Sequence, residues 1–142
     1  MADQRTLSPT LRPEIFQQQA SALIDRAPWS LKVTGLGAET LNVRQVTMQV
    51  VDRLGAAWNG RFRVYIYTGT AASPDEPVAC DVLTVTTGVG VVPIVAEGSF
   101  ECLTDENGRV VFTIEDSATV VRTLGGCVLG RVETLRTDVA FA

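Results

Sequence analysis

The sequence predicts an all-β domain, an antiparallel sandwich or small barrel, behind an N-terminal arm. From Leu31 onward apolar and polar residues tend to alternate, which is the period of a strand with one buried face. Glycine and polar turns divide this region into short β-rich runs, with no helical pattern between them. Helical spacing is confined to the first 29 residues. We therefore expect an arm at residues 1–29 and one β-domain at residues 30–142.

The arm divides into an extended part and a short helix. Residues 1–13 carry two prolines and scattered leucines, a pattern typical of extended chain. Pro13 suits a first helical turn and Pro28 ends the helix. A helix of about fourteen residues is marginal alone, so it packs either on its own β-domain or on a neighbouring subunit. The predicted partner-binding residues of the arm are Leu7, Leu11, Ile15, Phe16, Leu23 and Ile24.

Seven to nine strands are expected after the arm, in β-rich runs separated by turns. Pro93 cannot donate to a sheet ladder, so its run is expected to be an edge strand or a bulged one. The runs cover residues 31–37, 42–51, 61–69, 80–88, 90–98, 99–104, 109–116, 118–126 and 127–135.

The run "RFRVYIY" shows the strictest alternation in the chain. One set of its side chains should face the core and the other should face outward. The expected inward set is Phe62, Val64 and Ile66, and the expected outward set is Arg61, Arg63, Tyr65 and Tyr67.

Composition excludes several classes of function. The net charge of −4 and the pI of about 4.8 argue against binding to a phosphate backbone, so no nucleic-acid partner is expected. The chain has no histidine, which removes histidine-based acid–base catalysis and most zinc and copper sites. The many hydroxyls therefore lack an activating base, and Lys32 is the only lysine. We expect no catalytic residue, no metal site and no cofactor.

The three cysteines, Cys80, Cys102 and Cys127, are widely spaced and form no CxxC pair. Each lies among apolar or β-forming residues, which favours buried reduced thiols, although one disulfide and an odd thiol stays open as an alternative. This usage suits assembly in a reducing cytoplasm. The first residues contain no apolar segment of a secretory signal, and no stretch is long enough to span a membrane, so we expect neither.

Two glycine-punctuated turns carry a resemblance. In "VVDRLGAAWNG" a strand ends at an aspartate that two glycines follow, and in "LTDENGRVVFTI" the "DENG" turn precedes an alternating strand. The first half of the pattern stands as Met48, Val50, Asp52, Gly55 and Gly60, and the second as Thr104, Asp105, Gly108, Phe112 and Ile114. From residue 41 to 132 the chain resembles bacterial and phage immunoglobulin-like modules of the invasin and carboxypeptidase-regulatory kind. The resemblance implies an immunoglobulin-like antiparallel β-sandwich; family members share no single activity.

The whole chain resembles the small structural proteins of tailed-phage virions, in which such domains decorate capsids or tails and terminal arms connect subunits. The features that carry this resemblance are one β-domain, a proline-bearing arm, unpaired cysteines and "GGCVLGRVETL" near the end. It implies a non-enzymatic virion protein, assembled in the host cytoplasm. The implied partners are the major capsid protein or tail proteins and further copies of this chain. Capsid decoration is the first interpretation and a tail component is the second.

Acidic pairs and aromatic residues are the other candidate sites. Asp105–Glu106 and Glu115–Asp116 could supply calcium with oxygens, but they lack the alternating ligands of a calcium loop, so turn chemistry is favoured. Trp58, Tyr65 and Tyr67 allow three interpretations. They pack within their own domain, they bind a protein partner, or they form a platform for a glycan. A carbohydrate-binding or cell-surface-binding module is therefore the rival function.

Overall fold

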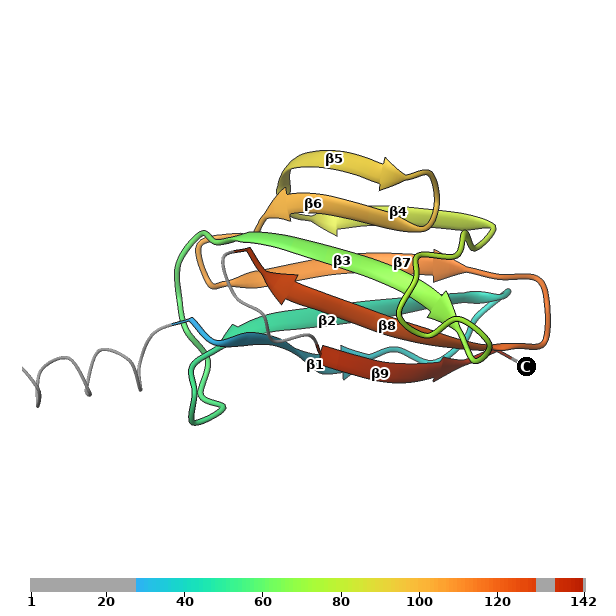
Figure 1. Cartoon of the computed structure of the whole chain (residues 1–142), viewed down its shortest axis with the longest axis horizontal. Coiled ribbons are helices and arrows are strands. Elements are labelled where there is room, and N and C mark those ends of the chain that lie inside the picture. Colours follow the sequence, from blue (N-terminus) through green and yellow to red (C-terminus); the bar gives the residue numbers. More distant parts are fainter. Residues whose placement is uncertain (1–27, 130–134, 142) are drawn as a thin grey trace, which may run out of the picture.

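The computed structural model describes residues 28–129 and 135–141, and these residues form an all-β structure with no helix. Nine strands build two antiparallel sheets that pack face to face (Figure 1). The predicted β-domain is thereby confirmed as two antiparallel sheets. The predicted short helix lies outside the described residues, as do the arm residues Leu7, Leu11, Ile15, Phe16, Leu23 and Ile24.

The first sheet has four strands and the second has five. In spatial order, the first sheet contains β1 (Ser30–Leu36), β2 (Val43–Val51), β7 (Arg109–Glu115) and β4 (Val82–Thr87). The second sheet contains β5 (Val89–Val95), β6 (Ser99–Leu103), β3 (Arg63–Thr70), β8 (Val121–Val128) and β9 (Leu135–Ala140).

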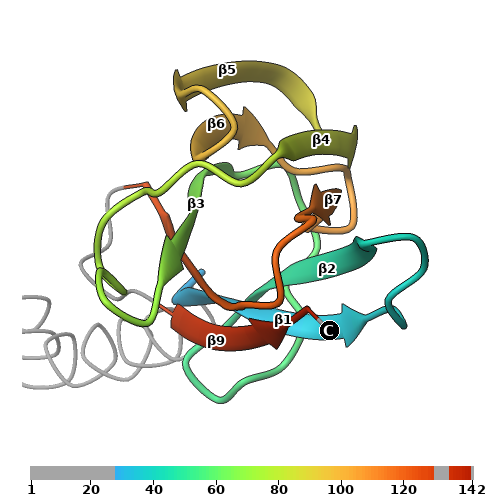
Figure 2. The ribbon, with the colours of Figure 1, turned by 90° about the vertical axis from the view of Figure 1, so that its right-hand side faces the viewer.

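The chain crosses between the sheets at most of its connections. Only the pairs β1–β2, β5–β6 and β8–β9 are consecutive neighbours within one sheet. As a result β4 and β5, one edge strand from each sheet, lie on the same side of the sandwich, and β1 and β9 lie on the opposite side (Figure 2). We call the β4–β5 side the open edge and the β1–β9 side the closed edge.

Alternation places one side-chain set of each inner strand between the sheets. In β7, for example, Val110, Phe112 and Ile114 are fully buried while the residues between them are half-buried. The rings of Phe100 and Phe112 meet edge to face, with centroids 5.6 Å apart, and join the two sheets. Full burial of each such side chain contributes about 1.5–3 kcal/mol. The core consists of Leu31, Val46, Met48, Val50, Val64, Ile66, Cys80, Phe100, Cys102, Val110, Phe112, Ile114, Leu124, Val128, Val139 and Phe141.

Two local turns hold the first sheet in register, as their residue types predict. The Asp52 carboxylate accepts hydrogen bonds from the backbone N–H groups of Leu54 and Ala56, both at 2.9 Å. The Asp105 carboxylate likewise accepts from two N–H groups at 2.9 Å in the turn before β7. Gly108 has φ +74°, and a Cβ there would lie 2.3 Å from the Trp58 carbonyl oxygen. This turn therefore requires glycine for its backbone angle and for its close approach to the β2–β3 loop.

The predicted run at residues 127–135 is wrong as a strand. Cys127 and Val128 continue β8, whose edge pairing with β9 begins at the Gly126–Leu135 partners. The last strand is β9, which runs to Ala140. The prediction for Pro93 is confirmed: β5 is an edge strand, and its register against β6 shifts on both sides of the Val92–Pro93 pair.

Candidate functional site: an exposed apolar edge

The three predicted aromatic site residues do not share an exposed face. Tyr67 is only 5% exposed, because its ring lies on Gly125 of β8, where a Cβ would come within 2.3 Å of the ring. Tyr65 is half-buried and stacks on Tyr67 with centroids 6.0 Å apart. Trp58 is half-buried and packs against the core from the β2–β3 loop. Tyr67 therefore lies on the outer face of its sheet beside Tyr65, as expected, but it is buried there and not available as an exposed ring.

The other side chains of "RFRVYIY" lie close to their predicted positions. Val64 and Ile66 are fully buried and Phe62 packs against the core, which confirms the inward set. Arg61 and Arg63 are exposed, as expected of the outward set. Arg63 lies 3.7 Å from a carboxylate oxygen of Glu101 in the neighbouring strand β6.

Among the described residues, the large exposed apolar side chains gather mainly along the open edge. Every residue of β5 is exposed, although the strand sequence is "VGVVPIV". Together with one residue of β4, its large side chains are 36–53% exposed, whereas folded chains usually bury valine and isoleucine. We call this set the apolar edge surface, and it consists of Val82, Val89, Val91, Val92, Ile94 and Val95.

A groove of about 230 Å³ opens between β4 and β5. Its floor reaches Phe100, which belongs to the core and is buried. A partner side chain entering here would contact the inner residues of β4 and the edge strand β5 together. The groove is lined by Leu83, Val85, Val91, Pro93, Ala96, Glu97, Ser99 and Phe100.

Carboxylates occupy one end of the open edge. The Glu97 side chain accepts a hydrogen bond from the backbone N–H of Leu83, and so joins the β5–β6 turn to β4. The Asp81 carboxylate accepts from the Ser117 N–H at 2.8 Å. Hydrogen bonds from the Ser117 side chain and backbone hold the pKa of Asp81 below its ordinary value. The apolar edge surface therefore ends in a negatively charged margin at neutral pH.

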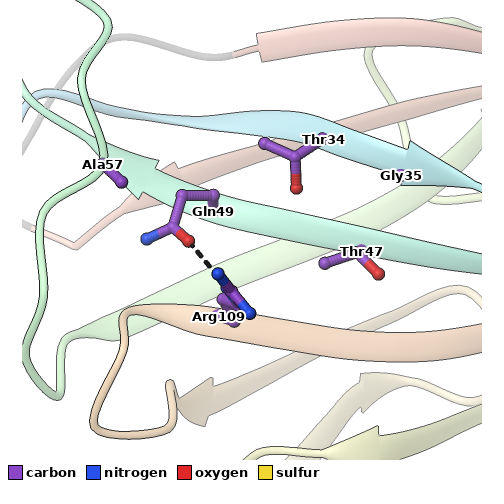
Figure 3. A pocket seen from close by; sticks show the side chains of 6 residues that line it. All are labelled: Thr34, Gly35, Thr47, Gln49, Ala57 and Arg109. Carbon is purple, nitrogen blue, oxygen red and sulfur yellow. Dashed lines mark hydrogen bonds between the residues drawn. The ribbon is translucent and has the colours of Figure 1, made fainter.

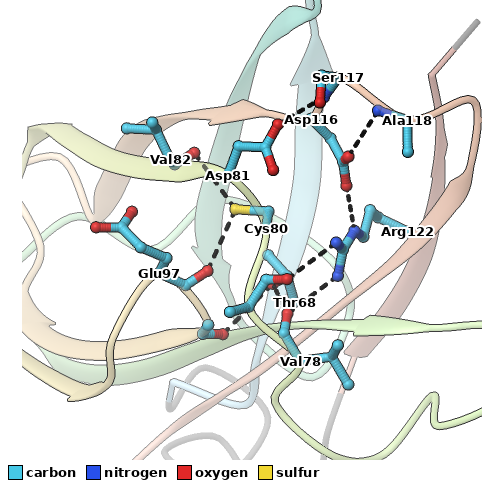
Figure 4. Close-up of polar contacts among 12 residues, drawn as sticks. Thr68, Val78, Cys80, Asp81, Val82, Glu97, Asp116, Ser117, Ala118 and Arg122 are labelled. Atoms are coloured by element: carbon cyan, nitrogen blue, oxygen red, sulfur yellow. Dashed lines mark hydrogen bonds and ion pairs between the residues drawn. The ribbon is translucent and has the colours of Figure 1, made fainter.

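A buried ion pair fixes the chain where it enters β4 (Figure 4). Arg122 donates from Nε to the Asp116 carboxylate at 2.7 Å, and both side chains are buried. The remaining guanidinium nitrogens of Arg122 donate to the carbonyls of Val78 and Ala79 at 3.1 and 3.0 Å. Cys80 follows directly, and its Sγ donates to the Glu97 carbonyl at 3.2 Å. These contacts hold β4 and the β5–β6 turn together.

The acidic pairs serve the fold in this structure. Asp105 caps its own turn and Asp116 pairs with Arg122. Between Pro28 and Leu129 and in residues 135–141, no three cysteine, aspartate or glutamate side chains gather as a metal site would require. The part of the chain that the structure describes also has no helix long and apolar enough to cross a membrane.

All three cysteines are free thiols in the structure. Cys80 and Cys102 are buried, and burial raises the pKa of each from 9.0 to about 11. Cys127 is half-buried, and burial raises its pKa as well. Since the thiolate is the reactive form, these thiols are poor nucleophiles at neutral pH.

The apolar edge surface was not predicted from the sequence. "VGVVPIV" lacks the alternation that separates a buried face from a solvated one, and this is the signal that could have pointed to it. The class that fold and surface define is a nine-stranded antiparallel β-sandwich with an apolar, exposed edge. The chain matches no protein-family model, and no curated protein is detectably similar to it in sequence.

Proposed function

We propose that this chain is a non-enzymatic structural protein of a tailed-phage particle, a capsid decoration protein that binds neighbouring virion subunits. The observation that carries the binding role is the apolar edge surface on β4 and β5. Contiguous apolar patches on a soluble protein mark interaction sites. The phage assignment rests on the resemblance of the whole chain to small virion proteins.

The finer fold proposed is an immunoglobulin-like sandwich. The two sheets, β1-β2-β7-β4 and β5-β6-β3-β8-β9, have the spatial strand order of a nine-stranded variable-type immunoglobulin domain. The connectivity differs: this chain forms the edge strand β4 before the β5–β6 hairpin, whereas an immunoglobulin chain adds the hairpin first. The proposal is therefore an immunoglobulin-like layout with a rearranged middle section.

The surface of the partner that meets the open edge is proposed to be apolar, with basic residues at its margin. Burying apolar surface contributes roughly 25 cal/mol per Å², so the valines and Ile94 supply the attraction. The Asp81 and Glu97 carboxylates at the end of the edge favour arginine or lysine on the partner and disfavour an acidic one. A partner side chain in the groove beside Phe100 would act as the anchor.

The arm is proposed to add a second attachment. Its apolar residues, Leu7 and Leu11 among them, would bury against a neighbouring subunit. Many copies of the chain on one particle would make the attachment multivalent, so a modest affinity per copy suffices. Tyr65 and Trp58 are half-buried and stay predicted partner contacts.

The test is co-sedimentation of the full-length protein with phage heads that lack it. We expect wild type to sediment with heads, and the double variant Val92→Asp/Ile94→Asp to lose at least tenfold in affinity. The matched control is the double variant Leu41→Asp/Leu54→Asp, which places the same two charges on exposed leucines away from the open edge. It should bind as wild type does. A second full-length variant, Leu7→Asp/Leu11→Asp, measures the share of the arm.

Two outcomes would overturn the capsid assignment. Wild-type protein that sediments with purified tails and not with heads would make it a tail component. Protein that ignores both particles but binds a glycan array, with Trp58→Ala or Tyr65→Ala abolishing that binding, would make it a carbohydrate-binding module. Equal binding by wild type and the Val92→Asp/Ile94→Asp variant would remove the apolar edge surface from the interface.

A further inference from the structure

We propose that a concavity on the outer face of the first sheet binds a carboxylate, presented by an acidic segment of a partner protein. The concavity has a volume of about 410 Å³ and lies over β1, β2 and the start of β7 (Figure 3). It is separate from the apolar edge surface and does not depend on the proposed function. Its lining consists of Thr34, Gly35, Thr47, Gln49, Ala57 and Arg109.

Gln49 forms the rigid floor of the site. It points to the outer face of its sheet but is only 4% exposed, because the β2–β3 loop and the turn before β7 cover it. Its Nε2 donates to the Asn107 carbonyl at 2.8 Å and to the Val50 carbonyl at 3.0 Å. Its Oε1 accepts from Nε of Arg109 at 3.1 Å. Since both ends of the amide are used, Gln49 acts as a support for Arg109.

Arg109 is the residue that meets the ligand. Its Nε is held by Gln49, and its backbone N–H is held by the Asp105 carboxylate at 2.9 Å. No described residue accepts a hydrogen bond from its two terminal nitrogens, and the side chain is exposed. Two N–H groups at the end of a fixed guanidinium match the two oxygens of a carboxylate. The support from Gln49 reduces the entropy lost on binding.

The surroundings of Arg109 suit an anion. The hydroxyls of Thr34 and Thr47 have no partner among the described residues and can donate to a bound oxygen. Lys32 of β1 is the register partner of Gln49 on one side, as Arg109 is on the other. Two cations therefore flank Gln49, and no carboxylate lines the concavity, in a chain whose net charge is −4.

The open shape favours a side chain of a partner over an enclosed small molecule. Ligand pockets usually bury most of their ligand behind apolar walls, whereas this concavity is open and most of its lining residues are polar. A protruding glutamate or aspartate needs only the arginine fork and the two hydroxyls. Flanking acidic residues of the same segment would gain from Lys32 at the margin.

The test is a titration of the full-length, isotope-labelled protein with an acetylated hexaglutamate peptide, followed by NMR. We expect shifts at the Arg109 Nε–H and at the amides of Thr34 and Thr47. Arg109→Lys keeps the charge but loses the fork, and should weaken binding about tenfold. Thr47→Val removes one hydroxyl at constant shape and should weaken binding about threefold. Arg63→Lys, the same exchange at an exposed arginine of the other sheet, is the matched control and should bind as wild type does.

Three results would overturn the proposal. Equal affinity of Arg109→Lys and wild type would mean that charge alone attracts the peptide. An equal loss in Arg63→Lys would mean that binding is spread over the surface. Sodium acetate that shifts the same resonances as strongly as the peptide would make the ligand a small free carboxylate. No phage particle enters this titration, so its failure is distinct from failure of the proposed capsid role.

Discussion

The two edges of the sandwich are completed by different kinds of contact. At the closed edge β1 packs against β8 and β9, and Leu31, Val139 and Phe141 are buried there. At the open edge the large side chains of β5 stay exposed, and polar contacts of Arg122, Cys80 and Glu97 hold the strands. Because these polar contacts hold the open edge together, its apolar residues stay exposed and remain available to a partner.

Asp116→Ala removes the buried ion pair at the open edge and has the largest expected effect on stability. It would leave the buried Arg122 guanidinium without its ion-pair partner, which costs about 4 kcal/mol of the free energy of unfolding. Urea denaturation measures the loss. A change below about 1 kcal/mol would mean that water reaches Arg122 and that the pair does not fix the entrance to β4. The Asp81→Ala variant is the control, since Asp81 is an exposed carboxylate in the same region.

Phe141→Ala tests the apolar contacts that hold the closed edge together. Phe141 is buried, and its N–H donates to the Val120 carbonyl at 2.8 Å. Removing the buried ring should lower the free energy of unfolding by about 3 kcal/mol, because it leaves a cavity between the sheets. Thermal and urea unfolding measure it. If stability stays unchanged, the closed edge does not depend on its last residues.

Local features of the fold could be predicted, and long-range contacts could not. The Asp52 and Asp105 turns follow from residues within a few positions of each other, and alternation identified Val64 and Ile66 as inner residues. The burial of Tyr67 depends on Gly125 of β8, which no pattern near Tyr67 reveals.

The dependence on long-range contacts also explains why neither the apolar edge surface nor the concavity at Arg109 was predicted. Pro93 predicted an edge strand, but exposure of that strand depends on which strand of the other sheet lies opposite. Gln49 and Arg109 are 60 residues apart in sequence and meet only because β2 pairs with β7. The crossing order of the strands is therefore the information that the sequence pattern lacks.

Alkaline pH should weaken the open edge through Cys80. Its single S–H proton can be donated to the Glu97 or to the Val82 carbonyl, at 3.2 and 3.3 Å, and burial raises the pKa of the thiol from 9.0 to about 11. The folded state holds this proton more tightly than the unfolded state, so the stabilisation is full below pH 9 and is lost as pH rises towards 11. By pH 10 we expect a loss on the order of 1 kcal/mol. Urea denaturation at several pH values measures it. In Cys80→Ala the decline should be smaller; an identical decline would contradict the assignment.

One matched substitution on the two edges tests the comparison directly, and its Val92→Thr arm has the smallest expected effect. Val92→Thr keeps the shape of an exposed side chain on β5, so the free energy of unfolding should change by less than about 0.5 kcal/mol. Val139→Thr buries the same hydroxyl in the closed edge and should cost about 1–2 kcal/mol. Urea denaturation of both variants gives the difference. Equal losses would mean that the β5 valines already pack within the chain; the apolar edge surface could then no longer carry the proposed binding role. If Val92→Thr leaves the free energy of unfolding unchanged, the exposed valines do not stabilise the isolated fold. This is expected of a surface that binds a partner.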